Sequence, residues 1–100
     1  MNELKEYQKW VKSKWKFKNK KLGFKDLYIM TAGFGGETGE VLEILKKKVR
    51  DGNFDEQHFT EELGDVFYYL TMLCNYHNIT LDDVIKTNKE KLEKRYKNRK

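Results

Sequence analysis

Two short acidic motifs of the same form constrain this chain more than any other feature. The first is Glu37-Thr38-Gly39-Glu40-Val41 and the second is Glu62-Leu63-Gly64-Asp65-Val66. In each motif two acids stand three residues apart, with a glycine between them. A residue advances by about 100° around an α-helix, so acids at this spacing share one helix face. We therefore expect both motifs to lie on helices that present matched acid pairs.

Each acid pair borders an arc of apolar residues on its predicted helix. The first arc contains Val41, Leu42, Ile44, Leu45 and Val49, and the second contains Leu63, Phe67, Leu70, Leu73 and Cys74. Glu43 and Glu61 fall on the opposite faces. If the two arcs pack together, four carboxylates come together on facing helices. Those carboxylates belong to Glu37, Glu40, Glu62 and Asp65.

Four carboxylates beside a core face repel one another, and burying an unpaired carboxylate is costly. The acids can therefore pair with lysines in solvent at the bundle edge, or they can hold a cation between them. No His or Cys occupies a matching position, so a bound ion would be a hard cation, Mg²⁺ or Mn²⁺. Such an ion usually also binds substrate phosphates.

The remaining pattern predicts a single all-α domain over residues 1–100. The predicted helices cover residues 3–17, Lys25 or Asp26 to Arg50, residues 56–77, and Thr80 to about Tyr96. A loop is expected from Lys18 to Phe24, and the last four residues are expected to fray. Four helices in one hundred residues predict a four-helix bundle, or an open helical layer that a partner chain completes.

Capping residues support these helix boundaries, whereas a group of glycines within the second predicted helix needs an explanation. Asp55 suits an N-cap, Thr80 with Asp83 resembles a capping box, and Gly52 suits a left-handed helix end. Four glycines between residues 33 and 39 weaken the second helix by about 1 kcal/mol each. They indicate either a break near residues 33–36 or a close approach by another helix or a ligand.

The charge of the chain is unevenly distributed. Residues 86–100 hold eight basic and two acidic residues, whereas the rest of the chain has a net charge of −1. Lys12 to Lys25 adds seven lysines and no acid. Such stretches attract nucleic acid or small polyanions, or they form a solvated surface.

The single cysteine, Cys74, is expected in the core, and it excludes an internal disulfide and fits a cytoplasmic protein. No apolar run is long enough to cross a membrane.

Beyond these signals, the sequence resembles the MazG-like all-α nucleoside triphosphate pyrophosphohydrolases. The matching segments are Gly36–Val41, Glu62–Leu70, Ile79–Val84 and Asn88–Tyr96. The resemblance implies that Glu37, Glu40, Glu62 and Asp65 bind the metal and carry catalysis. It implies that Asn88, Lys91 and Arg95 contact the substrate's phosphates and sugar. Gly36 departs from the family pattern, which has a glutamate at that position.

The resemblance also implies an activity and an assembly. The activity would be Mg²⁺-dependent hydrolysis of an NTP or dNTP between the α and β phosphates, with Mn²⁺ as an alternative ion. Relatives specialised for dUTP, dCTP or phosphoribosyl-ATP are not separated from this class by the sequence. The assembly would be a homodimer or homotetramer that shares helices across its interface.

Two other classes of function remain open. A basic helical module could bind nucleic acid through the two lysine-rich stretches, with Trp15 or Phe17 stacking on bases. That hypothesis does not explain the acid pairs, which would repel a polyanion, so nucleic acid is not the expected partner. A non-catalytic nucleotide-binding homologue is the other alternative, because Gly36 replaces an acid.

Overall fold

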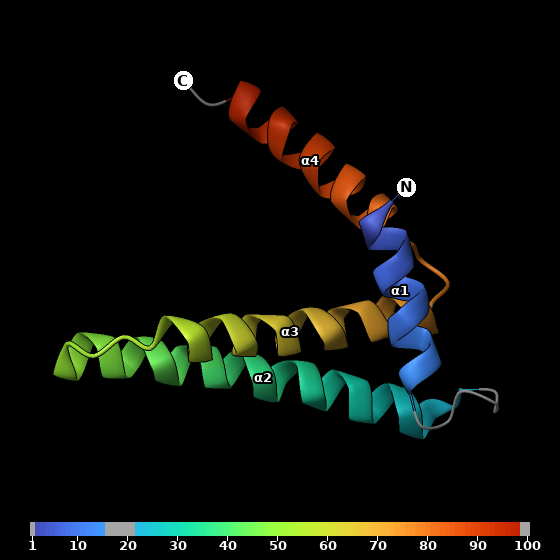
Figure 1. The fold of residues 1–100 in the computed structure, drawn as a ribbon. Coiled ribbons are helices and arrows are strands. Elements are labelled where there is room, and N and C mark those ends of the chain that lie inside the picture. The colour runs from blue at the N-terminus through green and yellow to red at the C-terminus, as the bar shows by residue number, and fades with distance from the viewer. Residues whose placement is uncertain (1, 16–21, 99–100) are drawn as a thin grey trace.

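The protein forms four helices in a computed structural model that describes residues 2–15 and 22–98. They are α1 (Glu3–Lys14), α2 (Phe24–Asp51), α3 (Glu56–Tyr76) and α4 (Leu81–Lys97). Figure 1 shows α2 and α3 side by side as a long hairpin, with α1 crossing one end of it and α4 leaving from that end. No strand occurs in the described ranges. The predicted all-α class with four helices is confirmed.

The hairpin is closed by the local chemistry that the sequence predicted. Gly52 ends α2 in the left-handed region at φ 77°, and its N–H donates to the Lys48 carbonyl at 2.8 Å. Asp55 begins α3 by accepting a hydrogen bond from the backbone N–H of His58 at 3.0 Å. A short connection between these caps turns the chain back, so α3 runs antiparallel to α2 (Figure 1).

The α2 helix continues without a break through its glycines, which excludes the first of the two explanations, a break near residues 33–36. The alternative explanation, a close approach, holds at Gly33. A Cβ atom there would lie 2.6 Å from Cζ of Tyr69 on α3, which is closer than side-chain carbons pack. At Gly35, Gly36 and Gly39 a Cβ atom would meet nothing within 4 Å. One glycine of the four is thus explained by packing against α3.

The buried core lies where α1 crosses the hairpin. It contains Val11, Trp15, Met30 and Met72, with tyrosines and aliphatic residues packed around them. Trp15 donates its indole N–H to Asp26 Oδ1 at 3.2 Å. The α1 helix ends at Lys14 rather than continuing to residue 17, because Trp15 is extended and turns into the core. Residues 16–21, which include Phe17 and most of the predicted loop, lie outside the described residues.

A large part of the predicted apolar arc on α2 is not buried within one chain. Ile44 is buried, but the exposed fractions of the Leu42 and Val49 side chains are 66% and 86%. On α3, Leu63 is 46% exposed, whereas Cys74 is buried as predicted. The two arcs therefore pack only in part against each other, and the tip of the hairpin presents apolar side chains to its surroundings.

The α4 helix begins after a tight turn and packs against α1. Asn78 has φ 57°, a left-handed conformation that ends α3 sharply. Thr80 then caps α4 by accepting a hydrogen bond from the Asp83 N–H at 3.0 Å, as predicted. Fraying was predicted for residues 97–100, but Lys97 is the last residue of α4 and Asn98 is its C-cap. Residues 99 and 100 lie outside the described ranges. None of the described helices is both long and apolar enough to span a membrane.

Candidate metal centre

Three of the four predicted acids meet between α2 and α3. Glu37 lies on α2, and Glu62 and Asp65 lie three residues apart on α3. Each offers a carboxylate oxygen, and these three oxygens all lie within 4.8 Å of one another. We call Glu37, Glu62 and Asp65 the acid trio. Their spacing is close enough for one cation to contact all three residues.

The surroundings of Glu37 disfavour the ionised form of its carboxyl group. Burial is the main factor that raises the pKa of Glu37, and a side-chain hydrogen bond with Asp65 adds to it. The negative charges of the surrounding acids, Asp65, Glu62 and Glu40, raise the same pKa further. A carboxyl group in this position holds its proton more tightly than a free glutamate does. A cation at the same place would reverse this effect.

Glu62 provides the observation that best fits a metal ligand. Its Oε2 atom is buried and has no hydrogen-bond partner among the described residues. A buried carboxylate oxygen without a partner is unfavourable by several kcal/mol unless a cation compensates it. The trio offers only carboxylate oxygens, the donors that Mg²⁺ and Mn²⁺ prefer. The residues present therefore fit a hard divalent cation.

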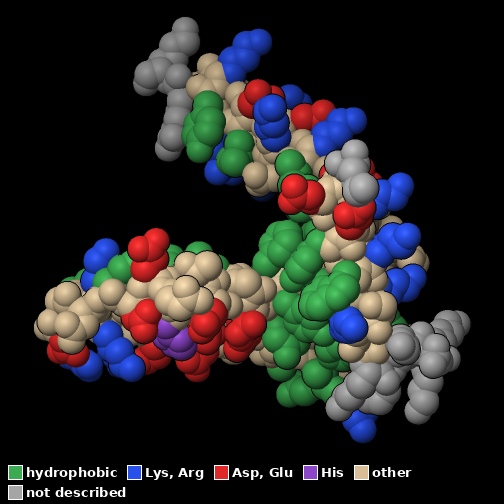
Figure 2. Space-filling model, viewed as in Figure 1, with side chains coloured by type: hydrophobic (Ala, Val, Ile, Leu, Met, Phe, Trp, Pro, Cys, Tyr) green, Lys and Arg blue, Asp and Glu red, His purple; other side chains and the backbone are tan. Residues whose placement is uncertain are grey.

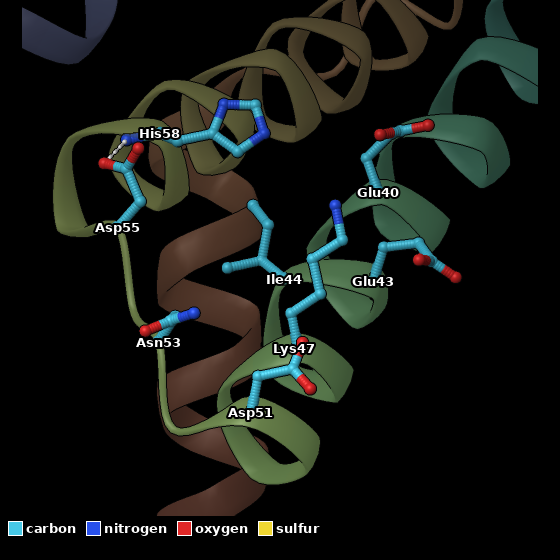
Figure 3. Close-up of a pocket in the computed structure, with 8 residues that line it drawn as sticks. All are labelled: Glu40, Glu43, Ile44, Lys47, Asp51, Asn53, Asp55 and His58. Carbon is cyan, nitrogen blue, oxygen red and sulfur yellow. Dashed lines mark hydrogen bonds between the residues drawn. The ribbon is translucent and has the colours of Figure 1, made fainter.

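Glu40 differs from the other three acids because its carboxylate is not part of this group. It is exposed and lies one helical turn after Glu37. It lines a neighbouring cavity of about 250 Å³ at the tip of the hairpin. The other lining residues are Glu43, Ile44, Lys47, Asp51, Asn53, Asp55 and His58 (Figure 3). The structure thus brings three predicted ligands together and places the fourth at the rim of an adjoining cavity.

Two residues of this cavity were not singled out by the sequence pattern. Lys47 lies seven residues after Glu40, two turns further along the same face of α2. In Figure 3 the Lys47 side chain extends from α2 on the side where Glu40 and His58 lie. The spacing from Glu40 was the signal that could have identified Lys47. His58 lies in the first turn of α3, and its side chain is exposed.

The predicted substrate-binding residues lie on a different part of the molecule. Asn88 and Lys91 line a groove of about 400 Å³ along α4, and Arg95 is exposed one turn beyond Lys91. Figure 2 shows a group of acidic side chains on the α2–α3 hairpin with basic side chains at its tip, whereas α4 carries both basic and acidic side chains. Within one chain, α4 packs on α1 and runs away from the hairpin. A single chain therefore does not bring these three residues to the acid trio.

Comparison with known proteins identifies the class of this fold. Residues 28–100 match the MazG nucleotide pyrophosphohydrolase domain. The chain belongs to the MazG nucleotide pyrophosphohydrolase family. The Gene 37 protein of Mycobacterium phage L5 is 35% identical over 74 residues, which cover 69% of this chain and 65% of that protein. The chain thus matches less than two thirds of the length of this relative. No solved structure matches it.

The MazG match spans the whole acid trio and the whole of α4. It begins within α2 at Tyr28, so α1 lies before it. Gly36 is exposed, and a Cβ atom there would meet nothing within 4 Å. Packing therefore does not require glycine at this position. Glycine at position 36 leaves α2 a continuous helix beside the acid trio.

Proposed function

We propose that this MazG domain hydrolyses nucleoside or deoxynucleoside triphosphates between the α and β phosphates in the presence of Mg²⁺. The products would be a nucleoside monophosphate and pyrophosphate. The observation that carries the proposal is the buried, unpartnered Oε2 atom of Glu62 within the acid trio. Membership of the family supports the reaction class, and the trio supports the need for a divalent cation.

In this proposal the acid trio holds the metal. Glu40, at the rim of the neighbouring cavity, either serves as a further metal ligand or takes part in catalysis from that position. Bound Mg²⁺ would neutralise phosphate charge and favour attack by water, with Mn²⁺ able to replace it. The chain itself contributes carboxylates that orient the water and accept its proton. Asn88, Lys91 and Arg95 would hold the phosphates and the sugar through charge-assisted hydrogen bonds.

We further propose that a second copy of the chain completes the site. The basic residues of α4 and the acid trio are separated within one chain, and apolar residues on α2 and α3 remain exposed. A homodimer, or a tetramer of two dimers, would cover these residues. It would also allow α4 of one subunit to approach the hairpin of another. Light scattering coupled to size-exclusion chromatography measures this assembly directly.

Pyrophosphate release from a panel of NTPs and dNTPs tests the proposed activity. The assay compares Mg²⁺, Mn²⁺ and EDTA for the wild type, Glu62→Gln and the matched control Glu61→Gln. Glu61 is the adjacent residue on α3, and its side chain is exposed. We expect metal-dependent release that Glu62→Gln lowers by at least about a hundredfold and Glu61→Gln leaves within about twofold.

The same assay separates the two other classes of function. Release of pyrophosphate that survives both EDTA and Glu62→Gln would contradict the metal centre. Absence of release by a folded wild type, with nucleotide binding retained, would identify a non-catalytic homologue. Binding to nucleic acid that falls steeply with salt and is unaffected by Glu62→Gln would favour the basic module instead.

A further inference from the structure

Gln8 on α1 connects three helices through both ends of its side-chain amide. Its Nε2 atom donates to Asn75 Oδ1 at 3.0 Å and to the Ile79 carbonyl at 2.8 Å. Its Oε1 atom accepts a hydrogen bond from the backbone N–H of Leu81 at 2.9 Å. Asn75 on α3 donates in return to the Gln8 carbonyl at 3.3 Å. One side chain thus joins α1, the end of α3, and the start of α4.

The bond to Leu81 acts at the first residue of α4. The first four N–H groups of a helix have no partner within the helix. The Thr80 hydroxyl accepts from the Asp83 N–H, and Gln8 accepts from the Leu81 N–H. The Leu81 side chain is only 2% exposed, so the same point is also packed. The N-terminus of α4 is therefore capped partly by a residue seventy-three positions earlier in the chain.

Contacts with α1 provide the main restraint on the direction of α4. Among the described helices, α4 packs chiefly on α1, and it projects away from the hairpin (Figure 1). A second bond, from Asn2 Nδ2 to Asp82 Oδ2 at 2.6 Å, lies at the same junction, but both of its residues are exposed. The turn that precedes α4 passes through Asn78 in its left-handed conformation. Gln8 is half-buried, and its side chain bonds both to this turn, at the Ile79 carbonyl, and to α4, at the Leu81 N–H.

We propose that Gln8 is a positioning residue that sets the direction of α4 and so places Asn88 and Lys91 for the substrate. The part that concerns substrate rests on the proposed function, in which α4 holds the phosphates. The part that concerns the direction of α4 rests on the hydrogen bonds alone. Because α4 is 17 residues long, a small change of angle at Leu81 becomes a displacement of several ångströms at its far end.

Residual dipolar couplings of backbone N–H groups measure the direction of α4 in the unmodified full chain. In the wild type, we expect one alignment tensor to fit α4 together with the α2–α3 hairpin. In Gln8→Ala we expect the couplings of α4 to become smaller, or to fit only when α4 is given a different orientation relative to the hairpin. The couplings of the hairpin remain as in the wild type. The neighbouring change Lys9→Ala, at an exposed residue, leaves both sets unchanged. Couplings of α4 that are the same in Gln8→Ala and in the wild type would overturn the proposal.

A second variant, Gln8→Glu, allows the same test if Gln8→Ala fails to fold. Gln8→Glu keeps the size of the side chain and the acceptor for Leu81, but the ionised carboxylate cannot donate to Asn75 or Ile79. We expect it to change the α4 couplings in the same direction and to retain the helical circular dichroism of the wild type. Unchanged α4 couplings in folded Gln8→Glu would count against the proposal in the same way.

Kinetics then test the consequence for substrate. In the pyrophosphate assay with Mg²⁺, we expect Gln8→Ala to raise KM about tenfold, while kcat stays within about threefold. A tenfold change in KM corresponds to the loss of about one hydrogen bond between α4 and the substrate. Altered couplings with an unchanged KM would overturn the role in placing Asn88 and Lys91. If the wild type hydrolyses no nucleotide, the proposed function fails, and the couplings alone decide whether Gln8 sets the direction of α4.

Discussion

The backbone of Gly33 on α2 lies directly against the ring of Tyr69 on α3. Because a Cβ atom at this position would overlap the ring, we expect Gly33→Ala to lower the free energy of unfolding by about 1–3 kcal/mol. The matched control is Gly35→Ala, where a Cβ atom would meet nothing within 4 Å. That change is expected to raise the free energy of unfolding by up to about 1 kcal/mol, because alanine favours helix.

Urea unfolding of both variants measures these opposite effects. The double variant Gly33→Ala, Tyr69→Ala provides a further check, since removal of the ring opens the space that the new methyl group needs. We expect the two changes together to be less destabilising than their sum. A Gly33→Ala protein as stable as Gly35→Ala would contradict the close packing of α2 against Tyr69.

The acid trio predicts a specific effect of metal on stability. We expect a hundredfold excess of Mg²⁺ over its dissociation constant to raise the free energy of unfolding of the wild type by about 2.7 kcal/mol. Glu62→Gln should lose most of this gain. Without metal, Glu62→Gln should be at least as stable as the wild type, because it removes a negative charge from a group of carboxylates.

Thermal unfolding with and without Mg²⁺ checks this prediction. Glu61→Gln should keep the metal effect, since Glu61 lies on the opposite face of α3 and is exposed. Equal stabilisation of Glu62→Gln and the wild type by Mg²⁺ would show that the ion binds elsewhere.

The raised pKa of Glu37 predicts how the metal-free protein depends on pH. The folded state holds this proton more tightly than the unfolded state does, so it binds more protons between the two pKa values. Stability therefore falls as pH rises from about 4.3, the pKa of a free glutamate, through the higher pKa of the folded state. Glu37→Gln should remove this contribution, and the difference between the two proteins should level off at higher pH.

Glu43 offers a control of opposite sign on the same helix. A hydrogen bond with Lys46, and then the charge of Lys46, lower the pKa of Glu43. Its contribution to stability is therefore present above the pKa of a free glutamate and is lost as pH falls through the lower pKa of the folded state. Urea titrations of Glu37→Gln and Glu43→Gln from pH 3 to 7.5 should give differences from the wild type with opposite slopes. Parallel slopes would contradict the electrostatics of the trio.

Burial predicts that Cys74 is chemically inert in the folded protein. It raises the pKa of the thiol, so little thiolate is present at neutral pH, and the side chain is also shielded from reagents. We expect iodoacetamide at pH 7.5 to modify Cys74 at least about a hundredfold more slowly in the native protein than in urea. Mass spectrometry follows this reaction, and rapid modification of the native chain would contradict a core position.

Much of the local structure could be predicted because it depends on residues close together in the chain. The side-chain caps at Asp55 and Thr80 and the backbone hydrogen bond at Gly52 each join groups three or four positions apart. The placement of Glu62 and Asp65 on one face of α3 follows from the helical repeat alone. The family resemblance also rests on short segments, chiefly the two acid motifs and parts of α4, and the match over residues 28–100 confirms it.

Other features depended on how the helices pack. The helical repeat gives the angle of each side chain around the axis of its helix, but it does not give the position of one helix along another. The sequence alone therefore predicted that all four acids, those of α2 as well as those of α3, would meet. The packing of α2 on α3 instead brings Glu37 to Glu62 and Asp65 and leaves Glu40 at the neighbouring cavity.

By itself, the sequence determined four helices, their caps and a set of acids suited to a divalent cation, because periodicity and capping are local properties. Only the tertiary structure decided which three acids meet, which apolar residues remain exposed, and how α4 is fastened to α1. These depend on contacts between distant residues, such as Gln8 with Leu81 and Gly33 with Tyr69, and no local pattern encodes such contacts.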